Sequence, residues 1–342
     1  MLKQMTIEPT KAENAKPWVV FWLKLIAAMI FVMVIVGGAT RLTDSGLSIT
    51  EWQPILGAIP PWSDVDWQTA FAKYQQSSQY KLQNVGMTMP SFQFIYWWEW
   101  SHRFLGRAIG VVFFVPFLIF ALTRRLERRI WPRLLLLFVV GGLQGALGWY
   151  MVASGLVDRV DVSQYRLAAH LTLAIALYAA VLWVILSVNE RHHPPRRFDE
   201  WLALLILFLV FLQIAAGGFV AGLDAGKGYN TWPLMDGQWI PQGLSTVTPA
   251  WRNIFENALT VQFNHRMLAY TILALAVWHA LRTFTLASML LAYAIFAQAC
   301  LGVLTLLMHV PIGVALVHQA GALIVVLAAV LNLHKKTAYS AT

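Results

Sequence analysis

Four of the nine histidines in this sequence occupy equivalent positions in an internal repeat. His102 and His170 lie in the first copy, and His265 and His318 lie in the second. Each lies near one end of an apolar segment long enough to cross a membrane, where an ionisable side chain is costly and marks a candidate functional site. Neutral imidazole is the usual axial ligand of haem iron, and two helices that each offer one imidazole can hold the iron from both sides. The paired histidines therefore indicate a haem site in each copy.

Other metals fit these histidines less well. A zinc or copper site needs further cysteine, aspartate or histidine ligands at short spacing, and none accompanies the four positions. Cys300 is the only cysteine, so the chain can form neither a disulfide nor a thiolate metal cluster. A single histidine in an apolar segment could equally be a hydrogen-bonded core residue. The occurrence of four such histidines in two matched pairs favours haem. His279 with His334 could hold an inner haem, but the first copy has no matching histidines.

The two copies differ in charge beside the first histidine of each pair. Glu99 precedes His102 by three residues, and the corresponding residue before His265 is Gln262. Tryptophans surround Glu99, and such an apolar setting favours a carboxylate that can exchange protons. The alternative is that Glu99 complements the positive N-terminus of its helix. Because the two copies of the site differ at this position, we expect the two sites to have different functions.

An arginine directly follows the first histidine of each pair, as Arg103 and Arg266. At the water interface, where haem propionates would emerge, a guanidinium can bind a carboxylate through two hydrogen bonds. These residues could equally be interfacial arginines that extend their side chains toward water. Both interpretations stay open at this point.

The repeat predicts the architecture that positions these residues. Segments that begin at Gly37 and Gly217 align without a gap for more than a dozen residues. Because each copy contains four expected spans, both face the same way, and a pseudo-twofold axis along the membrane normal should relate them. Each copy is predicted to be a four-helix bundle with its site in the core. Further matched pairs are Asp44 with Asp224, Gly46 with Gly226, Trp52 with Trp232, Gln144 with Gln298, and Gly148 with Gly302.

The composition is that of a membrane protein. With 58% hydrophobic and 12% charged residues in 342, and a mean hydropathy of +0.60, the chain has too little polar surface for a soluble fold of this size. Runs of ~20 apolar residues can each cross a hydrocarbon core of about 30 Å. The predicted fold is an all-α integral membrane protein whose eight transmembrane helices form two pseudo-twofold-related four-helix bundles. The expected spans are Trp18–Ala39, His102–Thr123, Leu134–Ser154, Leu167–Val188, Trp201–Ala221, Val261–Leu281, Ala287–Leu307 and Gly313–Leu333.

The net charge of +9 follows the positive-inside rule. The cations lie in alternate loops and not in one patch, which argues against a nucleic-acid partner. They predict that both termini are cytoplasmic, that the haem sites lie toward the periplasmic side, and that the protein lies in a bacterial inner membrane. The expected segments are a cytoplasmic N-terminal segment (1–17), a first four-helix half (18–188), a cytoplasmic linker (189–200), a second four-helix half (201–333) and a cytoplasmic tail (334–342). The basic residues are Lys3, Lys11 and Lys16 before the first span, Arg124, Arg125, Arg128 and Arg129 after the second, Arg191, Arg196 and Arg197 after the fourth, Arg282 after the sixth, and Lys335 and Lys336 after the eighth.

The sequence resembles the haem A synthase family over nearly its whole length. The motifs that carry the resemblance are Glu-Trp-Ser-His-Arg at 99–103, Phe-Asn-His-Arg at 263–266, the run Gly-Gly-Ala-Thr-Arg-Leu-Thr-Asp-Ser-Gly-Leu-Ser at 37–48, and His170 and His318. One branch of that family has a cysteine pair in the first outer loop. This sequence has none there, so it resembles the cysteine-poor branch of proteobacteria and mitochondria.

The resemblance implies that the C8 methyl group of haem O is oxidised to a formyl group, through successive hydroxylations and loss of water. It implies that His265 and His318 hold a resident haem B that passes electrons. His102 and His170 would face the substrate haem, with Glu99 close to the reacting edge.

The expected partners are haem O, membrane lipid and an electron donor, with haem O synthase and a second copy of the chain as further candidates. A different class of function is a di-haem membrane cytochrome b that relays electrons from quinol, and a third is a haem exporter. The extracted pigment distinguishes the first two, because a relay contains only haem B, whereas the enzyme also carries haem O or haem A.

Overall fold

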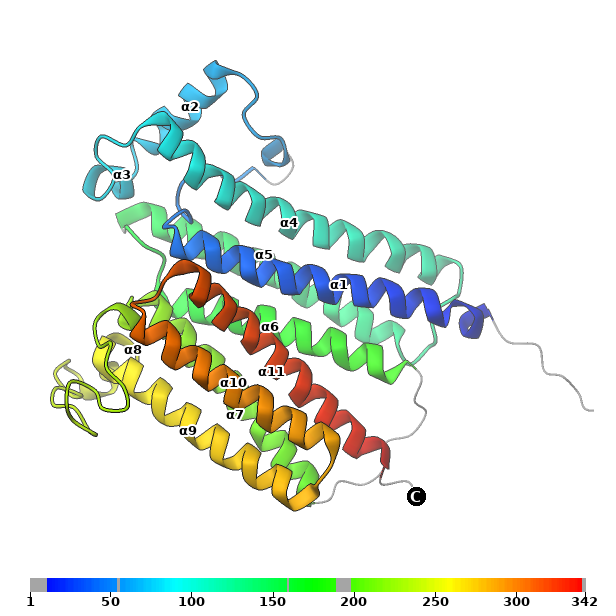
Figure 1. The fold of residues 1–342 in the computed structure, drawn as a ribbon. Coiled ribbons are helices and arrows are strands. Elements are labelled where there is room, and N and C mark those ends of the chain that lie inside the picture. Colours follow the sequence, from blue (N-terminus) through cyan, green and yellow to red (C-terminus); the bar gives the residue numbers. More distant parts are fainter. Residues whose placement is uncertain (1–10, 54–55, 159, 189–197, 340–342) are drawn as a thin grey trace, which may run out of the picture.

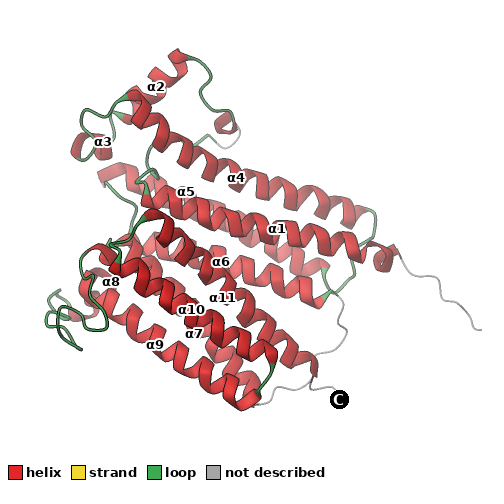
Figure 2. Cartoon of the chain, in the orientation of Figure 1, coloured by secondary structure: helices red, strands yellow, loops and turns green. Residues whose placement is uncertain are grey.

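The computed structural model describes residues 11–53, 56–158, 160–188 and 198–339, and their regular structure is helical (Figure 2). Seven helices are long and apolar enough to cross a membrane, which makes this a multi-pass helical membrane protein. The long helices are α1 (Lys11–Leu42), α4 (Met89–Leu122), α5 (Trp131–Asp158), α6 (Gln164–Ser187), α7 (Phe198–Gly222), α9 (Ala258–Thr283), α10 (Leu286–Leu307) and α11 (Ile312–Tyr339). The short helices are η1 (Leu56–Ala58), α2 (Asp64–Tyr74), α3 (Ser78–Leu82), η2 (Ala225–Lys227), η3 (Ala250–Arg252) and α8 (Asn253–Glu256).

Helix α9 corresponds to the sixth expected span, but it is not among the seven helices that are apolar enough to cross a membrane. It contains Asn264, His265, Arg266 and His279, whose polar side chains lower its hydropathy. Its 26 residues correspond to about 39 Å of helix, which is long enough to cross a hydrocarbon core of about 30 Å. The eight long helices match the eight expected segments in position, but composition alone supports only seven spans.

The long helices form two rings of four. In the first ring α1 contacts α4, α4 contacts α5, α5 contacts α6, and α6 contacts α1. In the second, α7, α9, α10 and α11 contact one another in the same cyclic order. The rings meet where α6 packs on α7 and α11, and where α1 packs on α11 (Figure 1). The first described residue of α1 and the last of α11 lie at one end of the molecule, opposite α2, α3 and α8 (Figure 1).

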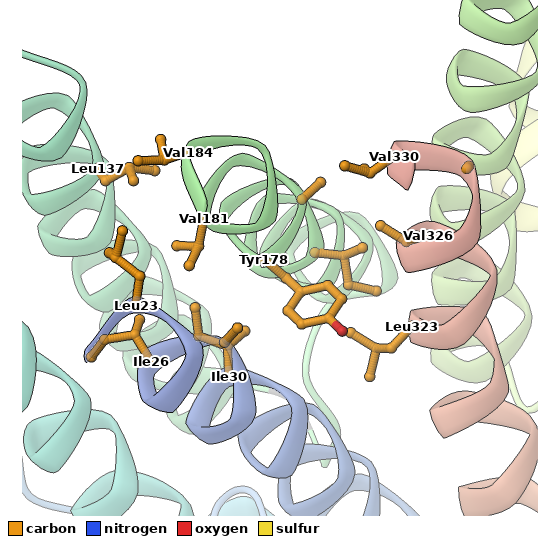
Figure 3. Close-up of a cluster of buried hydrophobic side chains, with 14 of the residues drawn as sticks. Leu23, Ile26, Ile30, Leu137, Tyr178, Val181, Val184, Leu323, Val326 and Val330 are labelled. Carbon is orange, nitrogen blue, oxygen red and sulfur yellow. The ribbon is translucent and has the colours of Figure 1, made fainter. Parts of the chain in front are cut away.

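A single apolar core runs through both rings. Figure 3 shows side chains of α1, α5, α6 and α11 meeting in one cluster, in which the Tyr178 ring points toward Leu323. Lipid tails are as apolar as these side chains, so close packing and van der Waals contact hold membrane helices together more than burial from water does. The two rings pack closely at the interface where α6 meets α7. A Cβ added at Gly218 of α7 would lie 2.8 Å from the Cα of Ala168 of α6.

Helix α4 begins much earlier than expected. The predicted span started at His102, whereas the helix starts at Met89 with Pro90 in its first turn, where a missing N–H costs nothing. The additional turns carry Phe92, which is buried against Tyr74 of α2 with ring centroids 5.3 Å apart. The long first outer loop is therefore partly helical and packs on the outer end of α4.

Arg41, at the end of α1, connects the two halves at the outer end of the seam, which is the interface between the two rings of helices. Its guanidinium donates to Asp44 (2.9 Å) and, across the seam, to Asp224 and the carbonyl oxygen of Ala221 (both 3.2 Å). Asp44 and Asp224 both have left-handed backbone conformations, with φ of 52° and 49°. Aspartate tolerates this conformation better than most residues, so the matched aspartates form an equivalent turn in each copy.

We expect Arg41→Ala to lower the free energy of unfolding by about 1 kcal/mol at pH 7, because solvent screens its half-exposed partners. Burial raises the pKa of Asp224, but the charges of Arg41 and Lys227 outweigh this effect and hold the pKa below its usual value. A group with a lowered pKa stabilises the fold above its unfolded pKa of about 3.9, and that contribution disappears as the pH falls through the folded pKa. The difference between the variant and the wild type should therefore be present at pH 7 and shrink below about pH 4.

The measurement is the unfolding of both proteins in detergent at pH 7 and pH 3. Burial is the largest influence on the pKa of Asp44 and raises it, but Arg41 lowers it, so the contact with Asp44 is also lost on acidification and adds to this dependence. Equal stability of the two proteins at pH 7 would show that Arg41 does not hold the halves together.

Candidate functional site

The structure places one pair of the four histidines in each ring of helices. His102 of α4 and His170 of α6 lie in the first ring, and His265 of α9 and His318 of α11 lie in the second. α4 and α6 are opposite members of their ring, as are α9 and α11. The rings of each pair are close enough for their charges to interact, and all four side chains are partly buried. The pairing predicted from the repeat is thus present in space.

Each of the four histidine rings packs against a glycine of a neighbouring helix. An added Cβ would lie 2.9 Å from Cε1 of His102, 2.9 Å from Cε1 of His170, 3.2 Å from Cε1 of His265 and 3.0 Å from Cε1 of His318. A side chain would therefore displace each ring, and only glycine lets the imidazole lie against the helix backbone. The four glycines, in the same order, are Gly37, Gly148, Gly217 and Gly302.

We expect Gly302→Ala to reduce haem bound in the second half, because the new methyl group must push the His318 ring out of line. Changes to a residue that orients a metal ligand commonly cost about 10–100-fold in affinity, and we expect a loss in that range. Low-spin haem per protein, measured optically in purified samples, checks this. Gly313→Ala is the matched control, because its Cβ would meet no atom within 4 Å and should leave haem content unchanged.

Three of the histidines have a glutamine beside the ring. Gln144 Nε2 lies 3.4 Å from a ring nitrogen of His170, and Gln213 Nε2 lies 3.2 Å from one of His265. The other nitrogen, Nδ1, is buried in both rings and has no hydrogen-bond partner. A haem iron needs a ring nitrogen that no protein group occupies, and each of these rings has one. The donor set therefore fits a haem iron.

Glu99 is 2% exposed and ties α4 to the outer loop that follows α1. Its Oε2 accepts hydrogen bonds from the Ser48 hydroxyl and the Ile49 N–H, both at 2.7 Å, and its Oε1 accepts one from Arg103 at 2.6 Å. Arg103 also donates to the carbonyl oxygens of Ile49 (2.9 Å) and Glu51 (3.0 Å). The carboxylate thus uses three of its roughly four acceptor positions, with one left on Oε1.

Gln262 occupies the same position in the second half with a different set of bonds. It is 3% exposed, donates to the carbonyl oxygen of Ala225 at 2.7 Å, and accepts from Arg266 at 2.8 Å. Arg266 donates to the carbonyl oxygens of Tyr229 and Thr231, both at 2.9 Å. Arg103 and Arg266 bind the two outer loops in the same way. Only the first of these clamps, formed by Glu99 and Arg103, contains a carboxylate.

These contacts exclude one of the two interpretations of Glu99 and one of the two interpretations of the arginines. Glu99 lies ten residues inside α4, so it cannot complement the positive helix N-terminus, whose effect falls off within the first turn. Arg103 and Arg266 do not simply extend toward water, because each binds loop carbonyl oxygens. Their binding of haem propionates stays a prediction.

Comparisons with known proteins agree with this geometry. The model of a family of cytochrome oxidase assembly proteins, COX15-CtaA, matches residues 20–330. The chain belongs to this family. Among its relatives, a haem A synthase of Parvibaculum lavamentivorans is 53% identical over 96% of both chains. Haem A synthases of Chelativorans sp. and Mesorhizobium japonicum are each 51% identical, over 92% and 89% of this chain and 90% and 86% of their own.

The remaining histidines lie apart from the two pairs. His279 is 0% exposed, and Asn332 lies 3.1 Å from its Nε2, while His334 packs edge-on against Trp183. His309 is exposed, and His192 and His193 lie outside the described residues, as do Lys3, Arg191, Arg196 and Arg197. The Asn332 contact gives His279 a hydrogen-bonded place in the core.

One apolar cavity is separate from the histidine pairs. It has a volume of about 460 Å³ and lies between α1, α6 and α11, lined by apolar side chains and Lys24. None of the four histidines lines it. Among the described residues, no group of three or more His, Cys, Asp or Glu side chains could hold a bare metal ion.

Sequence reasoning missed the residues that support the histidines. The repeat already matched Gln144 with Gln298 and Gly148 with Gly302, but it gave no reason why these types recur. The signal was that a glutamine and a glycine, four residues apart, precede the second histidine in both copies. Gln213 could not be found in this way, because its counterpart in the first copy is Met33.

Proposed function

We propose that this chain is a haem A synthase, a membrane-bound oxidoreductase that oxidises the C8 methyl group of haem O to a formyl group by successive hydroxylations. The observation that carries the proposal is the duplicated histidine pair, each ring seated on a glycine, in a chain about half identical to haem A synthases over most of its length. Haem A produced in this way would serve cytochrome oxidase.

The two halves would have different roles in this reaction. In the second half, His265 and His318 would hold haem B as the cofactor, which supplies electron transfer when bound. In the first half, His102 and His170 would hold haem O as the substrate and fix its orientation. The clamp formed by Glu99 and Arg103 would keep the outer loop closed over this site and exclude water.

Two groups of charged residues would complete the sites. Arg103 and Arg266 are proposed to bind haem propionates with the N–H groups that the loop carbonyls do not use. Glu99 is proposed to exchange a proton through the one free acceptor position on Oε1. These roles assign the chemistry to the first half, which alone carries the additional carboxylate.

The same proposal includes the topology. Eight spans, with α9 as the sixth, would form two four-helix halves related by a pseudo-twofold axis along the membrane normal. The matched contacts of Glu99 with Arg103 and of Gln262 with Arg266 support this symmetry. Both termini would lie in the cytoplasm of a bacterium, with the haem sites toward the periplasmic side of the inner membrane. The further partners would be membrane lipid, an electron donor, haem O synthase and a second copy of the chain.

The test is the pigment of the purified protein and of the membranes that contain it. Extraction and chromatography should yield haem B from the protein together with haem O or haem A, and haem A should appear in membranes only when the chain is expressed. Haem B alone, with no haem A in the membranes, would instead identify a di-haem cytochrome b that relays electrons from quinol.

A further inference from the structure

The first half has an arginine near its second histidine that the second half lacks. Arg166 lies in the first turn of α6, four residues before His170, and residues at this spacing share one face of a helix. The repeat aligns Arg166 with Val314, which precedes His318 by the same four residues. A cation therefore lies one turn outward from the second histidine in the first half only.

Two side chains of α5 hold the Arg166 guanidinium in place. Its Nη1 donates to the Ser154 hydroxyl, its Nη2 donates to the Tyr150 hydroxyl at 3.4 Å, and its Cζ lies 4.5 Å from the centre of the Tyr150 ring. The aligned residues of α10 are Met308 and Leu304, which have no hydroxyl group. The arginine and both of its supports thus belong to the first half alone.

The guanidinium keeps hydrogen-bonding capacity for a ligand. Arginine has five N–H groups, and Ser154 and Tyr150 each accept from one of them. None of the carboxylates whose side chains the structure describes forms a salt bridge with Arg166. The side chain is only partly buried, so an anion can reach the remaining N–H groups. Because Arg166 lies against α5, it does not simply extend toward water as an interfacial arginine would.

The anion that fits this position is a carboxylate. A guanidinium binds a carboxylate through two parallel hydrogen bonds, and the positive N-terminus of α6, where Ser163 makes no capping hydrogen bond, favours the same charge. A haem carries two carboxylates, its propionates, on one edge of the ring. Arg103 follows His102 on α4, which lies opposite α6 in the first ring of helices. The first half therefore offers one arginine on each of the two helices that carry its histidines.

We propose that Arg166 binds one propionate of the haem in the first half, while Arg103 binds the other. This inference rests on the proposed function, in which haem O is the substrate of that half. A haem held only by two axial histidines can turn about the axis that joins them and present different methyl groups to Glu99. Two bound propionates prevent this rotation, and the C8 methyl group neighbours one of them on the ring. Arg166 is thus a substrate-binding residue that determines which methyl group is oxidised.

The binding test compares two probes in the full-length protein, purified in detergent: ferric haem B and its dimethyl ester, whose propionates carry no charge. The parent protein contains His265→Ala and His318→Ala, so low-spin haem reports the first half alone. Arg166→Leu should weaken haem B binding by about 10–100-fold, the usual contribution of a hydrogen bond to a charged group, and leave the affinity for the ester unchanged. Arg166→Lys should recover part of the loss, because lysine keeps the charge but not the paired hydrogen bonds.

Arg252→Leu is the matched control, because it removes another arginine of the outer side, one whose partner is Glu256, and should leave both affinities unchanged. Equal losses for haem B and the ester in Arg166→Leu would mean that the variant only disturbs the fold, and would overturn the inference. An unchanged affinity for haem B would overturn it as well. If the parent protein bound no low-spin haem, or kept its spectrum after His102→Ala, the proposed function of the first half would itself be wrong.

A second measurement tests the choice of methyl group. In a chain that is otherwise unaltered, Arg166→Leu should divert part of the product to isomers oxidised at another methyl group, which chromatography separates from haem A. The haem B content of the second half should stay the same, because Arg166 belongs to the other half. Product that is still haem A alone would overturn the role of Arg166 in this choice.

Discussion

Replacement of His265 or His318 with alanine is expected to abolish low-spin haem B binding in the second half. Each change removes one of two axial ligands, and the nearest polar side chains, Gln213 and Gln298, are amides that do not replace an imidazole. The remaining histidine would leave at best a five-coordinate, high-spin haem. The measurement is the optical spectrum of the reduced, purified protein at matched concentration.

His309→Ala is the control for this experiment, because this exposed histidine lies in the short loop between α10 and α11 and should leave the spectrum unchanged. A wild-type low-spin spectrum in both His265→Ala and His318→Ala would mean that these residues are not haem ligands. Because haem B would supply the electrons, the same two variants should also stop haem A formation in membranes, although haem O can still bind to the first half.

Haem A formation in the Glu99→Gln variant is expected to fall by roughly 10²–10⁴-fold, which is the usual contribution of a general acid or base. The amide keeps the shape of the carboxylate but cannot exchange a proton at Oε1. The haem A to haem O ratio in membranes, at matched protein level, measures the loss, and haem O or a hydroxylated intermediate should accumulate. The resident haem B should stay, because Glu99 belongs to the other half.

A second variant separates proton exchange from loop anchoring. Ser48→Ala removes one hydrogen bond to the carboxylate while the carboxylate itself remains. If Glu99 serves chemistry, Ser48→Ala should stay near wild type, whereas a purely anchoring Glu99 predicts a comparable loss in both variants. A ratio near wild type in Glu99→Gln would show that neither role limits the reaction.

The candidate site residues could be predicted from the sequence because duplication repeats them. Histidine in an apolar segment is rare, and its recurrence at matched positions in both copies singled out His102, His170, His265 and His318. Their pairing within two rings of helices followed from the order of the spans. The helical, membrane-spanning class followed from composition alone.

The features that escaped prediction depend on contacts between distant segments. The start of α4 at Met89 could not be inferred from hydropathy, because its first turns pack on the outer loop and not on lipid. The binding of Arg103 to loop carbonyl oxygens requires the loop conformation, which no local pattern encodes. The roles of the glycines and glutamines appear only when neighbouring helices are placed against the histidines.

The continuous core between the two rings also bears on how such a chain could arise. A free-standing unit of four helices would expose to lipid the faces of its first and fourth helices, which here contact the other half. An ancestral protein of half this length would therefore be expected to pair with a second copy of itself through these faces. Arg41, whose counterpart in the second half is Ala221, breaks that equivalence at the seam. Such a one-sided contact can be selected only after the gene has been duplicated, because in a symmetric pair every substitution occurs twice.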